Sequence, residues 1–295
     1  GRTAKGKAMV NILPIDTGVS IAALMPVDAP ETEWDTLQIV FATSDGDVRR
    51  NALSDFTNVK RNGKIAMNLP EGVSLVNARI ADENDDVLLV TALGRAIRFA
   101  TTDVRVFKGR DSTGVRGVRL APGDRVVSMA VIRHFEATPE ERAAYLKQRR
   151  LVAGALDEAT ETEDEDDTAE VGQLSPERYA EMSAAEDLIL TVTSGGLGKI
   201  TSSHDYRITG RGGQGVRAAD AAMRGGPLVA AFPVETTDQV MLVTSSGQSI
   251  RVPVDGIRFL SRSGGGVKVL DLNGSDEEVA SVARISAEAE DGAEE

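Results

Sequence analysis

The 295-residue chain has no cysteine, and aromatic residues make up only 4% of it. Without cysteine it has no disulfide scaffold, thiolate zinc site, iron–sulfur cluster or cysteine nucleophile. Its two histidines, His134 and His204, have no clustered ligand partners in the sequence, so we expect no metal site. No apolar run reaches the roughly 18 residues of a membrane helix, and no apolar segment follows the basic residues at the start. A membrane span and a secretory signal are therefore not expected.

The charge of the chain is negative overall but unevenly distributed. It has 33 Lys and Arg against 46 Asp and Glu, a net charge of −13. Such a balance ordinarily argues against a nucleic-acid partner, because phosphates are neutralised by clustered bases. However, residues 134–186 contain 15 acids and 5 bases, and residues 286–295 contain five acids and no base. The rest of the chain has a net charge of +2, so the total does not exclude nucleic acid.

Residues 134–186 differ in composition from their surroundings and are predicted to be an acidic, partly helical insertion. Two helix start signals lie in it: Thr-Pro-Glu-Glu at 138–141, before a helix to Leu156, and Ser-Pro-Glu at 175–177, before a helix to Ala185. Each start combines an N-cap hydroxyl, a proline at the first helical position and an acid in the first turn.

Two segments are predicted to be disordered. Residues 157–170, with five consecutive acids at 163–167, cannot bury enough apolar surface to fold. The acidic tail 286–295 has the same character.

A repeat of about fifty residues organises the rest of the chain. Four segments, 37–46, 86–94, 187–196 and 238–247, share a polar lead, a short apolar strand, a Thr-x-x-Gly turn and a following basic strand. Their last glycines are 48, 102 and 51 residues apart, and removing the insertion brings the middle interval to 49. An acid follows each glycine by eight or nine residues: Asp55, Asp103, Asp205 and Asp255. Because these acids recur in every repeat, we interpret them as turn and strand-end groups rather than catalytic carboxylates.

Several short strands per repeat, separated by glycine turns, indicate an all-β, propeller-like fold. The sequence predicts four complete blades and part of a fifth, which suggests an array that begins upstream. The predicted domains are blades at 1–133 (the first one partial), the insertion at 134–186, further blades at 187–285 and the acidic tail at 286–295.

Each repeat ends in a second glycine turn that is rich in bases. The windows 1–13, 56–68, 104–119, 206–217 and 256–268 contain only one acid, Asp111. If the blades are equivalent, these turns form a curved basic stripe suited to phosphate oxygens. The competing interpretation is a solvated surface whose glycines serve only positive φ angles. With so few aromatics for stacking on single strands, duplex DNA is the favoured ligand. The candidate DNA-binding residues, taken from these turns and the basic strands, are Arg2, Lys5, Lys7, Arg49, Arg50, Lys60, Arg61, Lys64, Arg95, Arg98, Lys108, Arg110, Arg116, Lys199, Arg207, Arg211, Arg217, Arg251, Arg258, Arg262 and Lys268.

Two glycine motifs resemble nucleotide sites only superficially. Residues 210–215 satisfy G-x-G-x-x-G, but no helix is predicted after them, as the dinucleotide fingerprint requires. Residues 195–201 lack the Ser or Thr that follows lysine in a phosphate loop, because Ile200 stands there. We expect neither cofactor binding nor catalysis by this segment.

With the repeats laid out, the chain resembles the C-terminal domain of DNA gyrase A subunits. The resemblance rests on the opening GRTAKGKAMVNILP, the four Thr-x-x-Gly turns and TGVRGVRL at 113–120, and it covers nearly all of 1–133 and 187–285. It implies a six-bladed β-pinwheel, a propeller relative whose blades exchange strands and whose rim wraps duplex DNA for ATP-dependent negative supercoiling. It further implies an A2B2 assembly with an N-terminal cleavage domain and gyrase B, ATP and Mg²⁺ bound elsewhere in that assembly, and a bacterial cytoplasmic, nucleoid-associated location.

The sequence also departs from that family. The basic heptapeptide Gln-Arg-Arg-Gly-Gly-Lys-Gly of the family's first blade is missing, and RGGQG at 211–215 occupies the corresponding turn of a later repeat. Two alternatives stay open: the C-terminal domain of topoisomerase IV, and a propeller that binds an acidic protein. The acidic insertion and tail have two interpretations, as phosphate mimics that compete with DNA or as inert solvated segments.

Overall fold

The computed structural model describes residues 18, 21–60, 63–154, 172–219, 225–272, 274 and 276–287. Four of the candidate cations lie outside these residues: Arg2, Lys5, Lys7 and Arg61. The acidic stretch 157–170 and most of the tail also lie outside them.

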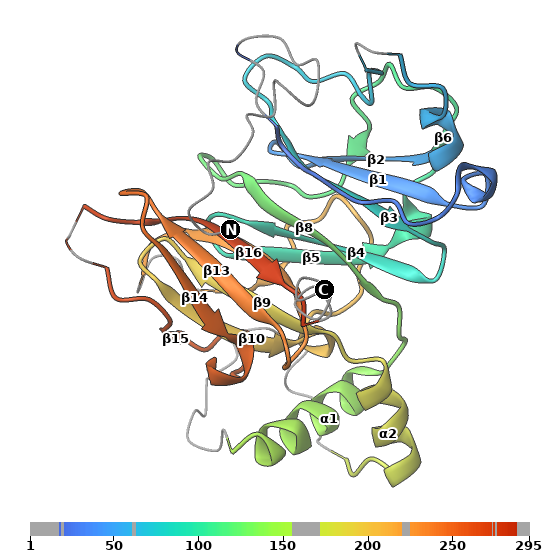
Figure 1. The fold of residues 1–295 in the computed structure, drawn as a ribbon. Coiled ribbons are helices and arrows are strands. Elements are labelled where there is room, and N and C mark those ends of the chain that lie inside the picture. Colours follow the sequence, from blue (N-terminus) through green and yellow to red (C-terminus); the bar gives the residue numbers. More distant parts are fainter. Residues whose placement is uncertain are drawn as a thin grey trace, which may run out of the picture.

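The described chain forms four sheets, here named blades A to D, and two α-helices (Figure 1). Each blade has a hairpin and a third strand from later in the sequence, and the first strand of the hairpin lies in the middle. These strands are β1 (Gln38–Thr43), β2 (Asp47–Ala52) and β3 (Leu75–Ala81) in blade A; β4 (Asp85–Thr91), β5 (Arg95–Ala100) and β8 (Val126–Arg133) in blade B; β9 (Leu188–Thr193), β10 (Leu197–Ser202) and β12 (Leu228–Val234) in blade C; and β13 (Gln239–Thr244), β14 (Ser249–Pro253) and β16 (Val279–Ile285) in blade D. The predicted all-β fold with four blades is confirmed.

The Thr-x-x-Gly motif forms the turn of each hairpin, and both of its fixed residues have a physical role. The glycines adopt left-handed φ angles, such as +91° at Gly46 and +84° at Gly94, which cost a residue with a Cβ atom free energy. The threonine hydroxyl accepts the N–H four residues further on, as from Arg95 to Thr91 and from Leu197 to Thr193, both at 3.1 Å. The motif therefore closes the hairpin and starts its second strand.

Neighbouring blades exchange short strands. β7 (Val115–Arg116) follows β5 in the sequence but pairs with β2 of blade A. In the same way β11 (Val216–Arg217) pairs with β5 of blade B, and β15 (Val267–Lys268) pairs with β10 of blade C. β6 (Val106–Phe107) joins β2 in parallel. This exchange confirms the pinwheel arrangement; within the described residues, β14 pairs only with β13.

Most of the hydrophobic core lies between neighbouring blades, and a separate cluster covers the outer face of blade A. In β4, Leu89 packs with Val40 of blade A, while its neighbour Leu88 packs with Ile189 of blade C. Successive side chains of a strand point to opposite faces, so both faces of blade B are covered. In the same way, Leu190 of blade C and Leu242 of blade D pack in one cluster between these two blades. Burial of each such leucine contributes about 1.5–3 kcal/mol, which stabilises the blades as a stack.

The insertion contains the two predicted helices, α1 (Pro139–Val152) and α2 (Pro176–Ala184). Thr138 and Glu141 form a reciprocal capping box at the start of α1. The predicted end of α1 at Leu156 is wrong, because the helix ends at Val152 and Gly154 follows with a φ of +70°. A left-handed glycine just past the last turn is a common helix stop.

The helix pair packs against blade C, at the end of the molecule far from blade A (Figure 1). Tyr145 and Met182 are buried, and Nε2 of His204 donates a hydrogen bond to the Met182 carbonyl at 2.8 Å. His204 belongs to the short 3-10 helix η6 (Ser203–Asp205) that follows β10. Further along α1, the Arg149 guanidinium lies 4.5 Å from the centre of the Phe259 ring. The described part of the insertion is therefore a packed element and not a solvated loop.

Candidate nucleic-acid interface

The exchanged strands carry three cations at one register position. Arg116, Arg217 and Lys268 each lie two residues after a glycine of the second turn, and all three side chains are exposed. Each is the last residue of its exchanged strand, which pairs with the second hairpin strand of the preceding blade. Their register partners, Asp47, Arg95 and Leu197, each follow a hairpin glycine by one residue, so the three cations occupy equivalent positions of successive blades. These three residues are named here the cation row.

Glycine is required where each exchanged strand begins. A Cβ atom would lie 2.3 Å from the Val48 carbonyl oxygen at Gly114 and 2.2 Å from the Ala96 carbonyl oxygen at Gly215. Both glycines also have left-handed φ angles, +107° and +70°. The glycines of the second turns therefore admit the exchanged strand, and this role is structural whether or not a phosphate approaches the turn.

Two exposed arginines lie opposite each other on neighbouring strands of blade B. Arg217 of β11 is the register partner of Arg95 of β5, and both side chains are exposed. Like charges directly opposite each other on neighbouring strands are destabilising, so the fold alone gives no reason for this pair. On blade A the partner is acidic instead: Asp47 Oδ1 lies 3.2 Å from Arg116 Nε.

Arg98, a predicted DNA-binding residue, is buried, and that prediction is wrong. Its Nε lies 2.7 Å from Asp86 Oδ2, and both side chains are at most 2% exposed. The remaining guanidinium nitrogens donate to the carbonyls of Ser203 and Arg133, both at 2.8 Å. Arg98 therefore connects blade B to blade C and to the start of the insertion.

Arg49 and Lys199 are also buried, and their predicted contact with DNA is wrong. Both lie three residues after the hairpin glycine, and both reach into the second turn of the next repeat. Arg49 Nη1 donates to the Ser112 hydroxyl at 2.8 Å, and burial lowers the pKa of its guanidinium. Lys199 Nζ donates to the carbonyls of Ser261, Arg262 and Gly264. Arg49 also donates to the Ser112 carbonyl, so both bases satisfy carbonyls of the second turn in the following blade.

Two further candidate DNA-binding residues, Arg50 and Arg262, are also buried, and their predicted contact with DNA is wrong. Arg50 donates to Gln38 Oε1 at 2.9 Å, and burial lowers its pKa. Arg262 is 7% exposed and bonds to the preceding blade. The basic strands β2, β5 and β10 are covered on both faces, so their sequence has no inside–outside alternation that separates buried from exposed bases.

The other described candidates are at least partly accessible. Three of them, Lys64, Arg110 and Arg207, are half-buried. Lys64 donates to the Asp55 carbonyl at 3.1 Å, and Arg110 donates to the Ile65 carbonyl at 2.7 Å. The exposed ones outside the cation row are Lys60, Arg95, Lys108, Arg211, Arg251 and Arg258.

The structure adds one base that the sequence prediction omitted. Val106, Ile208 and Phe259 pair in parallel with the second hairpin strand of the preceding blade. Their partners, Arg50, Arg98 and Ile200, each lie four residues after the hairpin glycine. The residues just before Val106, Ile208 and Phe259 are arginines: Arg105, Arg207 and Arg258. Arg105 is exposed and lies over the Phe107 ring, 4.3 Å from its centre. The sequence could have indicated Arg105, because it lies two residues after the recurring acid Asp103, as Arg207 lies two residues after Asp205.

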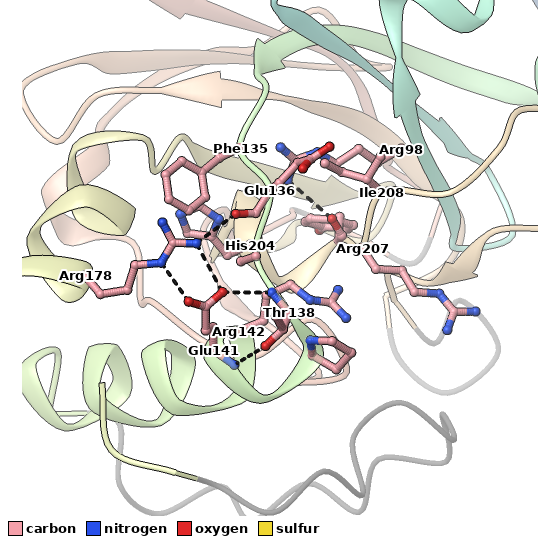
Figure 2. A pocket seen from close by; sticks show the side chains of 13 residues that line it. Arg98, Phe135, Glu136, Thr138, Glu141, Arg142, Arg178, His204, Arg207 and Ile208 are labelled. Carbon is pink, nitrogen blue, oxygen red and sulfur yellow. Dashed lines mark hydrogen bonds and ion pairs between the residues drawn. The ribbon is translucent and has the colours of Figure 1, made fainter. Parts of the chain in front are cut away.

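A cavity of about 660 Å³ lies between the insertion and blades B and C (Figure 2). Its charged lining includes Arg178, whose Nε lies 2.8 Å from Glu141 Oε1, and Arg98, which is paired with Asp86. Glu136 also lines it. Arg142 and Arg207 complete the charged lining. Arg98 and Arg178 are held in ion pairs with carboxylates, so these two guanidiniums are not presented to an anion in the cavity.

The two glycine motifs that superficially resemble nucleotide sites have structural roles. Residues 210–215 lead into strand β11 and not into a helix, and Gly198 and Lys199 lie inside strand β10.

Tyr206 is buried, and its hydroxyl shares a hydrogen bond with the Thr201 hydroxyl at 3.0 Å. Burial raises the pKa of Tyr206 to about 12. Among the described residues, no group of three His, Asp or Glu side chains is placed to hold a metal ion. None of the described helices is long and apolar enough to cross a membrane.

Strand exchange between successive blades, with cations on the exchanged strands, defines the chain as a β-pinwheel, a variant of the β-propeller. The chain belongs to the DNA gyrase C-terminal domain family of β-propellers. The family model matches at 38–82, 85–133, 187–235 and 238–286, once for each blade and more than half of the chain in total.

Curated relatives agree with this family. The chain is 49% identical over 293 residues to the DNA gyrase A subunit of Granulibacter bethesdensis, covering 96% of this chain and 31% of that protein. It is 40% identical over 294 residues to the corresponding protein of Rickettsia bellii, covering 98% of this chain and 32% of that protein. The chain thus spans about a third of the length of these relatives.

Two solved structures share the fold. A C-terminal domain of DNA topoisomerase IV superposes with a TM-score of 0.70 at 20% sequence identity, covering 98% of this chain and 74% of that one. A DNA gyrase A C-terminal domain superposes with a TM-score of 0.68 at 18% identity, covering 97% and 77%. At these identities the likeness concerns the fold alone.

Proposed function

We propose that this chain binds duplex DNA without sequence preference along the cation row and bends it around the blades. The observation that carries the proposal is the recurrence of an exposed cation, Arg116, Arg217 or Lys268, at the same position of three successive exchanged strands. Cations spaced along a rigid edge contact phosphates and carry no base-specific information. Arg95 and the arginines Arg105 and Arg258 add charge to the same blades.

Bending requires several such contacts. Smooth bending of 20–30 bp by 40–90° costs about 1–6 kcal/mol, so one phosphate contact does not offset it. Each phosphate neutralised releases counterions, and the logarithm of the affinity falls with the logarithm of salt concentration with a slope of about −0.9 per contact. The chain's negative net charge is compatible with this, because its excess of acids lies in the insertion and the tail.

The relatives support a proposal for the wider role of the chain. We propose that the chain is the C-terminal, DNA-wrapping part of a gyrase A polypeptide and supports ATP-dependent negative supercoiling. The partners are then an N-terminal cleavage domain and gyrase B in an A2B2 assembly of the bacterial cytoplasm, with ATP and Mg²⁺ bound outside this chain. Sequence identities of 40–49% to gyrase A subunits favour this over topoisomerase IV.

The test is a gel-shift titration of the full chain with relaxed duplex DNA over a salt series. The variant R217E/K268E reverses two cations of the row, and R125E/K147E reverses two exposed cations elsewhere with the same change in net charge. We expect the first to weaken binding at low salt by at least tenfold for every DNA sequence and to flatten the salt dependence. The second should change affinity much less. Equal effects of the two variants would contradict the role of the cation row in DNA binding. If the chain binds an acidic protein tightly and has no affinity for DNA, the alternative of a propeller that binds an acidic protein is favoured.

A further inference from the structure

Arg262 crosses the boundary between two blades without reaching the surface. It is 7% exposed, and its Nε donates to the Asp205 carbonyl at 3.0 Å. Its Nη1 donates to the Arg217 carbonyl, and its own backbone N–H donates to Asp205 Oδ2 at 2.9 Å. One guanidinium therefore joins the two ends of segment 205–217, and the second end is the backbone of a residue of the cation row.

Arg211 repeats this arrangement one blade earlier. Its Nε donates to the Asp103 carbonyl and its Nη1 to the Arg116 carbonyl, both at 3.0 Å. Arg211 and Arg262 both lie four residues before the glycine of the second turn, and Arg116 and Arg217 both lie two residues after that glycine in the preceding repeat. The same atoms thus make the same contacts at two successive boundaries.

The chemistry of arginine suits this role. Its guanidinium is planar and presents its N–H donors in a fixed fork, so two carbonyls held at once have a defined separation and orientation. The strands that receive this support, β7 and β11, are only two residues long. Such short strands have few ladder hydrogen bonds to orient the side chain that they carry. A second attachment through the carbonyl of the cation itself limits that freedom.

We propose, on the basis of the proposed DNA-binding function, that Arg262 and Arg211 are positioning residues that orient Arg217 and Arg116 toward DNA phosphates. Arg262 acts from the protein interior and does not touch DNA. Each blade thereby sets the direction of the cation on the blade before it, so the row keeps a fixed spacing from one blade to the next. Preorganisation of this kind improves binding because less side-chain freedom is lost when DNA is bound.

The proposal is tested by a double-mutant cycle on the full chain with the single changes R217A and R262K and their combination. Lysine keeps the positive charge but offers only one ammonium in place of the fork, so it cannot hold both carbonyls in the same geometry. Affinity for a fixed duplex is measured over a salt series, and thermal unfolding of each variant shows whether it is folded at the temperature of the titration.

We expect R217A and R262K to weaken binding to a similar degree, about three- to tenfold at low salt, with the salt slope reduced by about 1 in magnitude in each case. The double variant should bind like R217A alone, because Arg262 acts through Arg217. In the reference cycle, R262K and R116A should be additive, because the Arg116 carbonyl is held by Arg211 and not by Arg262. R211K with R116A should repeat the first result.

Other outcomes separate the two proposals. If R217A weakens binding but R262K adds its own independent loss, or leaves the binding of the folded protein unchanged, the positioning role is wrong while the cation row stands. If R217A and R116A both leave affinity and salt slope unchanged, the cation row itself is wrong, and the positioning role fails with it.

Discussion

Asp86 and Arg98 form an ion pair in the interior of blade B, with 2.7 Å between Oδ2 and Nε and almost no solvent exposure of either side chain. The other Asp86 oxygen lies 2.7 Å from His134 Nδ1, and Arg98 also donates to the Ser203 carbonyl of blade C. A base that the sequence suggested for DNA is thus part of the support between blades and the insertion.

The first prediction concerns this pair. Asp86→Asn should lower the free energy of unfolding by roughly 3–5 kcal/mol, because it leaves the Arg98 charge buried without compensation. The control is Asp271→Asn, which removes the partner of Lys268 in an exposed ion pair. Exposed pairs contribute little, so this variant should unfold like the parent chain. Urea unfolding followed by circular dichroism measures both, and equal stability of the two variants would contradict the structural role of Asp86.

The second prediction separates backbone strain from strand exchange at two glycines of the same motif. Gly94→Ala and Gly247→Ala both place an alanine at a φ near +85°, which costs about 1–2 kcal/mol. At Gly94 the new Cβ would also lie 2.1 Å from the Ala219 carbonyl oxygen of the exchanged segment, whereas at Gly247 nothing lies within 4 Å. Gly94→Ala should therefore destabilise the chain clearly more than Gly247→Ala in thermal unfolding. If both variants lose the same thermal stability, the close approach of the Ala219 carbonyl at Gly94 does not contribute to the destabilisation.

The third prediction concerns the pH dependence of insertion docking. Burial lowers the pKa of His204 below its ordinary value, with Arg98 acting in the same direction and Glu186 and Asp187 against it. The neutral ring is therefore favoured in the folded state, and the docking contribution is complete above about pH 6.5, the pKa of an unperturbed histidine. It should be lost progressively as the pH falls below that value toward the lowered pKa. Hydrogen exchange of α2 amides between pH 5 and 8 measures the effect.

The control for that measurement is His204→Gln, whose amide can still donate to the Met182 carbonyl but does not titrate. In this variant α2 protection should show no pH dependence beyond intrinsic exchange chemistry. A pH profile that is the same in both proteins would assign the effect to another group.

The fourth prediction addresses the acidic stretch of the insertion, residues 157–170, which contains nine acids. Replacing it with a Gly/Ser segment of equal length should tighten DNA binding severalfold at low salt, because phosphate mimics near a cationic surface compete with DNA. The effect should vanish near 0.5 M salt as screening increases. Unchanged affinity in low-salt gel shifts would favour the inert interpretation. A matched replacement of the tail 286–295 tests the second acidic segment in the same way.

Local signals in the sequence correctly predicted much of this fold. The Thr-x-x-Gly turns and the start signals of α1 and α2 each act over a few residues, and all have the expected structure. The end of α1 was misplaced, because the stop at Gly154 lies inside a stretch whose composition still favours a helix.

The sequence by itself determined the number of repeats, the place of the insertion and the positions where bases recur. Only the tertiary structure decided which of these bases face solvent. Arg49, Arg98 and Lys199 lie on strands that are covered on both sides, and each is buried against carbonyls of a neighbouring blade. Arg116 and Arg217 are exposed because their strands cross to the edge of the preceding blade. That separation depends on contacts between residues far apart in the chain, which a pattern confined to one repeat does not contain.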